Sequence, residues 1–182
     1  MNPPNPLAAR YAAAPTFPQF LEAAVENRDL WKAVTDRAQA PETLVKRARA
    51  LTRTRHLIAL AEDWCGDAVN IVPVAARLAA ELPGLDMKVF RRDENPDLMD
   101  AHLTRGARSI PVVILFDESF NELGWWGPRP VSLQEWVISK GLAMEKEARY
   151  VEVRKWYARD RGETTIEEIV SLMEKVERGA GG

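Results

Sequence analysis

The sequence predicts a single α/β domain in which a central mixed β-sheet is flanked by helices. Between residues 56 and 126, apolar runs of strand length alternate with runs of helical character. The expected strands cover 56–62, 87–92, 111–117 and 122–126, and the expected helices cover 67–82 and 96–103. Such alternation favours a sheet covered by helices, and the first two strands, joined by one helix, should be parallel. The turn-rich segment 117–121 should join the last two strands as an antiparallel hairpin.

Extra helices are expected at both ends of the chain. The segment 1–16 is rich in Pro, Ala and Asn, which favours irregular structure. From Phe17 to about Asp36, apolar residues recur at helical spacing, and a second helix should cover 41–51. We therefore expect one domain over 1–182, with its core at about 51–140 and helical extensions at 17–50 and 131–178.

Composition and charge exclude several classes of protein. The 182 residues are 46% hydrophobic and 29% charged, as in ordinary globular proteins. The net charge of −2 argues against nucleic-acid or anionic-membrane binding, which need a basic surface. No apolar run is long enough to span a bilayer, and the first residues lack the basic and apolar segments of a signal peptide. The single cysteine excludes an internal disulfide, so we expect a cytoplasmic protein. The sequence does not indicate an oligomeric state.

One stretch carries the chemistry: Glu62-Asp63-Trp64-Cys65-Gly66-Asp67-Ala68, where a strand ends and a helix begins. The sulfur of Cys65 should face the unpaired N–H groups of that helix, whose partial positive charge favours the thiolate. This effect reaches about 2 kcal/mol, or roughly 1.5 pKa units, which predicts a pKa of about 7 from a reference near 8.5. Asp67 opposes the thiolate as a nearby anion, so we expect only moderate activation.

Four motifs resemble those of the thioredoxin family. Trp64-Cys65-Gly66 resembles the start of its Trp-Cys-Gly-x-Cys motif, and Pro73 falls where these proteins kink the following helix. Arg92-Asp93-Glu94-Asn95-Pro96 resembles the family's Asp-x-Asn-Pro link, and Ser109-Ile110-Pro111 resembles its cis-proline tripeptide. The similarity covers about 51–140. It implies a thioredoxin-like fold in which a cis-proline, Pro111, lies opposite Cys65 and exposes backbone groups to an extended substrate.

Two departures from the family pattern concern the same step of the family's reaction. Ala68 stands where the second cysteine belongs, so that Trp-Cys-Gly-Asp-Ala replaces Trp-Cys-Gly-x-Cys, and Ala59 stands where the family has a buried acid. That acid helps to move the proton of the second cysteine, so the joint loss is chemically coherent. Dithiol exchange cannot run within this chain.

Several functions remain open for this single-cysteine site. In a monothiol thiol–disulfide oxidoreductase, Cys65 is the nucleophile, and an external thiol such as glutathione acts as co-substrate. The partners would be protein or small-molecule thiols and disulfides, and the expected substrate-binding residues are Trp64, Gly66, Asp67, Ile110 and Pro111. The alternative is a redox-inactive binding module that uses the same groove. A third role is iron–sulfur ligation with glutathione across a dimer, as in monothiol glutaredoxins, whose motif Cys-Gly-Asp-Ala resembles only loosely.

The sequence therefore leaves open whether the protein is an enzyme. It gives no indication of a resident cofactor. It also predicts no metal site, because His56 and His102 lie far from any cluster of ligand spacing.

Overall fold

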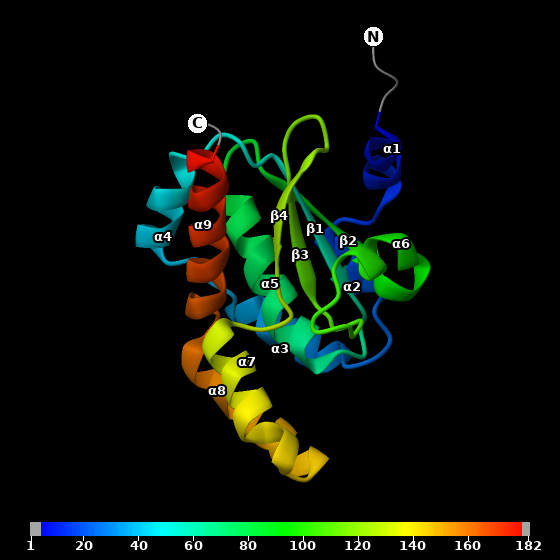
Figure 1. The fold of residues 1–182 in the computed structure, drawn as a ribbon, viewed down its shortest axis with the longest axis vertical. Coiled ribbons are helices and arrows are strands. Elements are labelled where there is room, and N and C mark those ends of the chain that lie inside the picture. Colours follow the sequence, from blue (N-terminus) through cyan, green and yellow to red (C-terminus); the bar gives the residue numbers. More distant parts are fainter. Residues whose placement is uncertain (1–4, 180–182) are drawn as a thin grey trace.

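The computed structural model describes residues 5–179 and shows a four-stranded sheet with helices packed around it (Figure 1). The strands are β1 (His56–Ala61), β2 (Asp86–Arg91), β3 (Val112–Phe116) and β4 (Glu122–Trp126). The helices are α1 (Pro6–Ala13), α2 (Phe17–Ala23), α3 (Arg28–Arg37), α4 (Glu42–Arg49), α5 (Gly66–Glu81), α6 (Pro96–Ala101), α7 (Val131–Ser139), α8 (Lys146–Asp160) and α9 (Glu163–Arg178), with short 3₁₀ helices η1 (Arg92–Glu94) and η2 (Gly141–Ala143).

The strand order is β2-β1-β3-β4, with β1 parallel to β2 and antiparallel to β3, and β3 antiparallel to β4. This confirms the predicted α/β class, the parallel first pair and the terminal hairpin. The predicted strands and core helices match the observed ones to within two residues at each end, because apolar runs and helix-start residues mark them locally.

Helices cover both faces of the sheet, and β4 shows which helix lies on which face. Adjacent residues of a strand point to opposite faces. Trp126 is buried and its indole N–H donates to Glu168 of α9 at 2.7 Å. Trp125 packs edge-on against the His102 ring, which follows α6, with ring centroids 5.6 Å apart. The helices α9 and α6 therefore lie on opposite faces, with α5 beside α9 (Figure 1).

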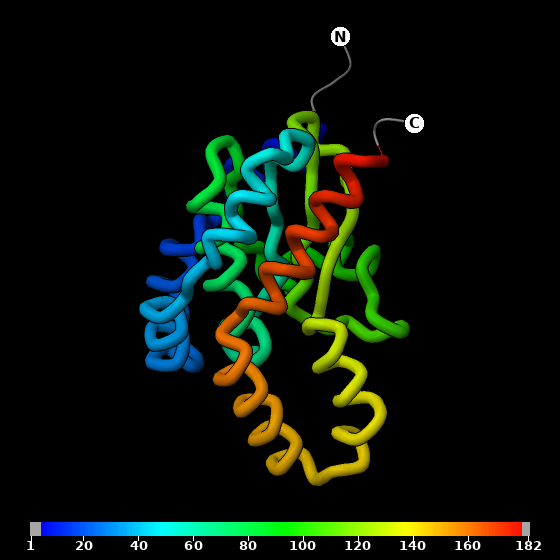
Figure 2. Tube along the Cα trace, turned by 90° about the vertical axis from the view of Figure 1, so that its left-hand side faces the viewer, coloured from blue at the N-terminus to red at the C-terminus, as the bar shows by residue number. Residues whose placement is uncertain are grey.

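The C-terminal extension has two parts. Helix α9 packs along β4, α4 and α5. Helices α7 and α8, joined through η2, form a hairpin that extends beyond the end of the sheet (Figures 1 and 2). Among residues 5–179, no helix is both long enough and apolar enough to cross a bilayer.

At the N-terminal end, the expectation of irregular structure up to residue 16 is wrong, because α1 forms there. The Asn5 side chain caps the helix by accepting the Leu7 N–H at 3.0 Å, and Pro6 occupies the first turn, where its missing N–H has no cost. Tyr11 fixes the helix to the domain through the rings of His56 and Phe120, each with its centroid 5.1 Å away. The prediction for residues 1–4 lies outside the described part of the chain.

The single helix predicted from Phe17 to about Asp36 is also wrong, because it divides into α2 and α3. Between them, the Asp63 carboxylate accepts the N–H groups of Val25 and Glu26 at 2.8 and 3.3 Å. Asn27 then adopts a left-handed conformation, with φ of 53°. Hydrogen bonds to a residue far along the chain thus interrupt a segment whose apolar spacing is continuous.

Candidate functional site at the start of helix α5

The motif stretch lies where it was expected, between the end of β1 and the start of α5. Cys65 is the N-cap residue of α5, and the helix begins at Gly66. Pro73 lies inside α5. The side chain of Cys65 makes no cap hydrogen bond, but the N–H groups of Asp67 and Ala68 favour its thiolate form.

The Cys65 thiol is buried rather than presented to solvent. The residue is only 9% exposed, and its S–H donates to the Ile110 carbonyl oxygen at 3.4 Å. Burial raises the pKa of Cys65 to about 11, and the negative charge of Asp67 adds to the rise. The two backbone N–H groups and the Arg129 guanidinium act in the opposite direction without reversing it. The predicted activation, with a pKa of about 7, is therefore wrong: desolvation outweighs the helix terminus.

Asp67 forms the centre of a buried polar cluster. Its carboxylate accepts two hydrogen bonds from the Arg129 guanidinium, at 2.6 and 3.0 Å, and one from the Tyr157 hydroxyl at 2.8 Å. Arg129 follows β4, and Tyr157 belongs to α8. Asp67 thus binds two segments of the chain that lie 62 and 90 residues further on. The sequence analysis identified neither partner, since no local pattern marks either residue.

Arg129 reaches Asp67 because its loop passes very close to the loop that carries Pro111. Gly127 has φ of +135°, and a Cβ there would lie 2.4 Å from the Pro111 carbonyl oxygen. Glycine avoids both the conformational cost and the collision. The Ile110–Pro111 and Gly127–Pro128 peptide bonds are both cis. Glycine at position 127 therefore permits the contact that places a guanidinium beside the motif.

The two acids before Trp64 are held by other parts of the chain. Glu62 accepts from Arg91 at 3.1 Å and from the Asp93 N–H at 3.1 Å. Burial alone would raise the pKa of Asp63, but hydrogen bonds from the N–H groups of the α2–α3 link, helped by the charge of Arg91, lower it below its ordinary value. These partners stabilise the carboxylates.

Of the expected site residues, Trp64 and Gly66 lie at the surface, whereas Cys65, Asp67, Ile110 and Pro111 are buried. The structure brings Cys65 and Ile110 into direct contact. Trp64 is 47% exposed, and the Arg92 guanidinium carbon lies 4.9 Å from the centroid of its ring. The accessible part of the motif is thus an indole covered on one side by a cation, a contact favoured by the ring quadrupole.

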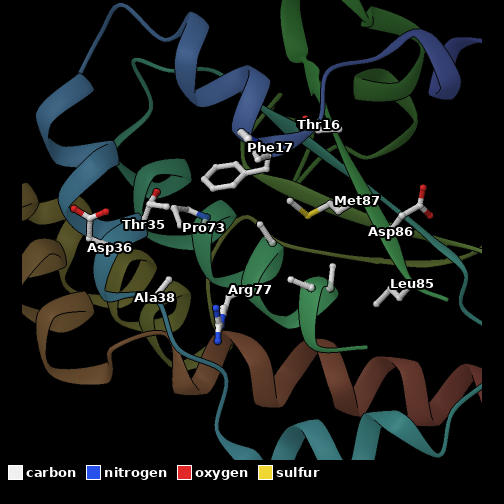
Figure 3. Close-up of a pocket in the computed structure, with 14 residues that line it drawn as sticks. Thr16, Phe17, Thr35, Asp36, Ala38, Pro73, Arg77, Leu85, Asp86 and Met87 are labelled. Atoms are coloured by element: carbon white, nitrogen blue, oxygen red, sulfur yellow. The ribbon is translucent and has the colours of Figure 1, made fainter. Parts of the chain in front are cut away.

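Two hollows of the surface lie away from the thiol. The first, of about 450 Å³, lies between α2, α3, α5 and β2, with Phe17, Pro73 and Met87 in its wall (Figure 3). The second, of about 1160 Å³, separates α3 from the C-terminal end of α8. Neither is lined by Cys65, Trp64 or Pro111.

The two histidines lie in polar contacts of their own. His56 pairs with Asp86 at 2.6 Å, and His102 contacts the Leu98 carbonyl and Glu122 at 2.6 and 3.0 Å. Within residues 5–179, no group of three or more His, Cys, Asp or Glu side chains is arranged to hold a metal ion.

Comparison with known proteins identifies the family. A protein of unknown function from Pseudomonas aeruginosa has a similar structure, with a TM-score of 0.72 and 19% identity over 92% of this chain and 96% of that chain. An HIV epitope scaffold gives a TM-score of 0.69 and 18% identity over 92% and 97% of the two chains. At these identities the similarity shows the fold alone. No curated protein matches significantly. The family model described as thioredoxin matches residues 14–168, including the Trp-Cys-Gly start of α5, β1 to β4 and parts of both helical extensions. The chain therefore has a thioredoxin-like fold and belongs to the thioredoxin family.

Proposed function

We propose that this protein is a thioredoxin-fold binding module whose motif-bearing surface engages a protein partner without thiol turnover. The observation that carries the proposal is the buried Cys65 thiol, whose pKa is raised to about 11. At pH 7 a thiol with that pKa is ionised in about one molecule in 10,000. Because the thiolate is the attacking species in disulfide exchange, such a site is poorly suited to redox turnover.

The rest of the motif supports the same reading. The chain has no second cysteine, and the positions of the family's resolving cysteine and buried acid hold Ala68 and Ala59, both fully buried. The Asp67 carboxylate, two residues after Cys65, accepts hydrogen bonds from Arg129 and Tyr157. These groups serve packing and charge pairing within the fold.

Trp64 supplies the surface that the proposal requires. Large aromatic residues are enriched among the side chains that dominate protein–protein binding energy. An exposed indole backed by Arg92 fits an apolar segment of a partner protein. We place this interaction in the cytoplasm, since the single cysteine needs no oxidising compartment.

A second candidate is monothiol exchange, and it is favoured by the N–H groups of Asp67 and Ala68 at the sulfur. In that reaction the Cys65 thiolate attacks a disulfide, forms a mixed disulfide and expels one thiolate. An external thiol such as glutathione then attacks the mixed disulfide, which releases Cys65 and leaves the external thiol joined to the substrate sulfur. No net oxidant is consumed.

The pH dependence of Cys65 alkylation, with intact mass after exposure to oxidised glutathione, separates the two candidates. The binding module requires slow alkylation with an apparent pKa well above 8.5 and no adduct at neutral pH. An apparent pKa below 8.5, with an adduct that added thiol removes, would establish monothiol chemistry and reject the first proposal.

Binding itself is tested by selecting displayed peptides on the Cys65→Ser variant. Binders should lose affinity for a Trp64→Ala, Cys65→Ser double variant. They should retain it when Val25, an exposed residue of the α2–α3 link, is replaced by Ala instead. Recovery of no peptide that depends on Trp64 would count against a binding role for this surface.

A further inference from the structure

Helix α8 has two distinct faces. Its inner face carries Val153 and Tyr157, both buried, and Tyr157 attaches the helix to Asp67. A second face, about 100° around the helix axis from these two residues, consists of five exposed residues at helical spacing (i, i+3, i+4, i+7, i+11), which we call the outer face of α8: Glu147, Tyr150, Val151, Arg154 and Ala158. Tyr150 is 36% exposed and Val151 is 40% exposed. The outer face therefore presents an apolar centre to solvent.

The charges at the two ends of this centre have no ion-pair partners within residues 5–179. Glu147 lies one turn before Tyr150, and Arg154 lies one turn after it. Neither takes part in a salt bridge there, although the neighbouring Lys155 pairs with Glu152 at 2.7 Å on the same helix. A negative end, an apolar centre and a positive end thus follow one another along the outer face.

This order is self-complementary under a two-fold axis. If two copies of α8 pack antiparallel about a point between Tyr150 and Val151, Glu147 of each copy faces Arg154 of the other. Tyr150 of each copy then faces Val151 of the other, so both charge pairs and the apolar centre form at the same register. An isologous interface requires this type of self-complementarity.

The shape of the molecule leaves room for such a contact. The hairpin of α7, η2 and α8 extends away from the sheet (Figures 1 and 2). Its tip carries Leu142, which is 64% exposed. In an antiparallel pair, the tip of one copy lies toward the C-terminal end of the other α8, where the hollow between α8 and α3 is lined by Leu30 and Val34. The Leu142 side chain can therefore be covered by the second copy.

We propose that the outer face of α8 is a self-association surface that binds α8 of a second copy in antiparallel orientation. One pair of helices with a small apolar centre corresponds to the low end of specific interface sizes, which is typical of weak association. We expect a dissociation constant of about 10–100 μM.

Analytical ultracentrifugation of the full chain, from about 1 μM to 1 mM, measures this equilibrium. The variant R154E places two carboxylates opposite each other at each end of the interface, and E147R places two guanidinium groups there. Each variant alone should raise the dissociation constant about 30-fold. An equimolar mixture of the two should associate as a heterodimer about as tightly as the wild type, because all facing charges are then opposite.

The matched control is R105E, which reverses an exposed charge in the loop between α6 and β3, on the α6 side of the sheet and away from α8. It should associate like the wild type. Both test residues are exposed and unpaired in the described structure, so all variants should keep the wild-type urea midpoint. A wild-type protein that stays monomeric up to about 1 mM overturns the proposal. A dimer that persists in R154E and E147R, or a mixture that does not associate, overturns it equally.

Discussion

Replacing Asp67 by asparagine should make the Cys65 thiol more acidic while making the fold less stable. Asp67 and Arg129 form a buried ion pair, with side chains 6% and 19% exposed. An asparagine keeps one acceptor oxygen but removes the charge, so the guanidinium is left uncompensated. Removing one partner of a buried pair costs about 3 kcal/mol at the low end of measured values, which lowers the melting temperature by about 6–12 °C. The same change deletes an anion that raises the pKa of Cys65 and leaves Arg129, which lowers it, unopposed. The pKa should therefore fall below the wild-type value of about 11, while burial keeps it above its ordinary value.

The two effects are measured by urea unfolding and by the pH dependence of alkylation on the same preparation. Tyr157→Phe is the control, because it removes one hydrogen bond to Asp67 without changing any charge. It should cost about 1–2 kcal/mol of stability and should not make the thiol more acidic. If Asp67→Asn destabilises the protein but leaves the pKa of Cys65 unchanged or raised, the charge of Asp67 does not control the thiol.

Three further outcomes are expected. Gly127→Ala should lower the free energy of unfolding by about 2–4 kcal/mol, measured in urea, because φ is +135° and the new Cβ would meet the Pro111 carbonyl. Gly66→Ala is the control and should leave that free energy unchanged, because open space surrounds the position. Equal effects of the two substitutions would contradict the role assigned to Gly127. Folding raises the pKa of Cys65 from 9.0 to about 11, so the stability that this group contributes is fully present below pH 9 and is lost as the pH rises through 11. Over that range the free energy of unfolding of the wild type should fall by about 2.7 kcal/mol relative to that of Cys65→Ala. Parallel curves of stability against pH for the two proteins would show that folding does not raise the pKa of the thiol. Ala68→Cys should form an intramolecular disulfide with Cys65 on oxidation, because position 68 is where the family has its second cysteine. The disulfide is detected as a mass loss of two hydrogens, and an unchanged mass would show that the two positions are not in disulfide geometry.

The parts of the structure that could be predicted from the sequence are those encoded locally. Strand β1 is recognisable from its unbroken apolar run, and the start of α5 from the residues that surround Cys65. By contrast, the division between α2 and α3 is imposed by Asp63, which lies 38 residues beyond Val25. A local pattern cannot report a hydrogen bond of that span, so the apolar spacing alone predicts one continuous helix.

The same limit applies to the candidate site. A helix terminus is visible in the sequence, and it correctly predicts that backbone N–H groups favour the Cys65 thiolate. The burial that outweighs them depends on the Ile110 loop and on segments that carry Arg129 and Tyr157, which meet only in the folded protein. A prediction that counts the helix terminus but omits desolvation therefore places the pKa of such a thiol too low and overestimates its reactivity.

The arrangement around the motif shows how the helical extensions at both ends of the chain are attached to it. The N-terminal extension binds Asp63, since the α2–α3 link donates to its carboxylate and the Trp31 indole donates to its carbonyl oxygen at 2.9 Å. The C-terminal extension binds Asp67 through Tyr157. The two acids on either side of the Trp64-Cys65-Gly66 motif are thus used to attach the two extensions. Among the motif's side chains this leaves Trp64 accessible, and it is through this indole that we propose the protein recognises a partner.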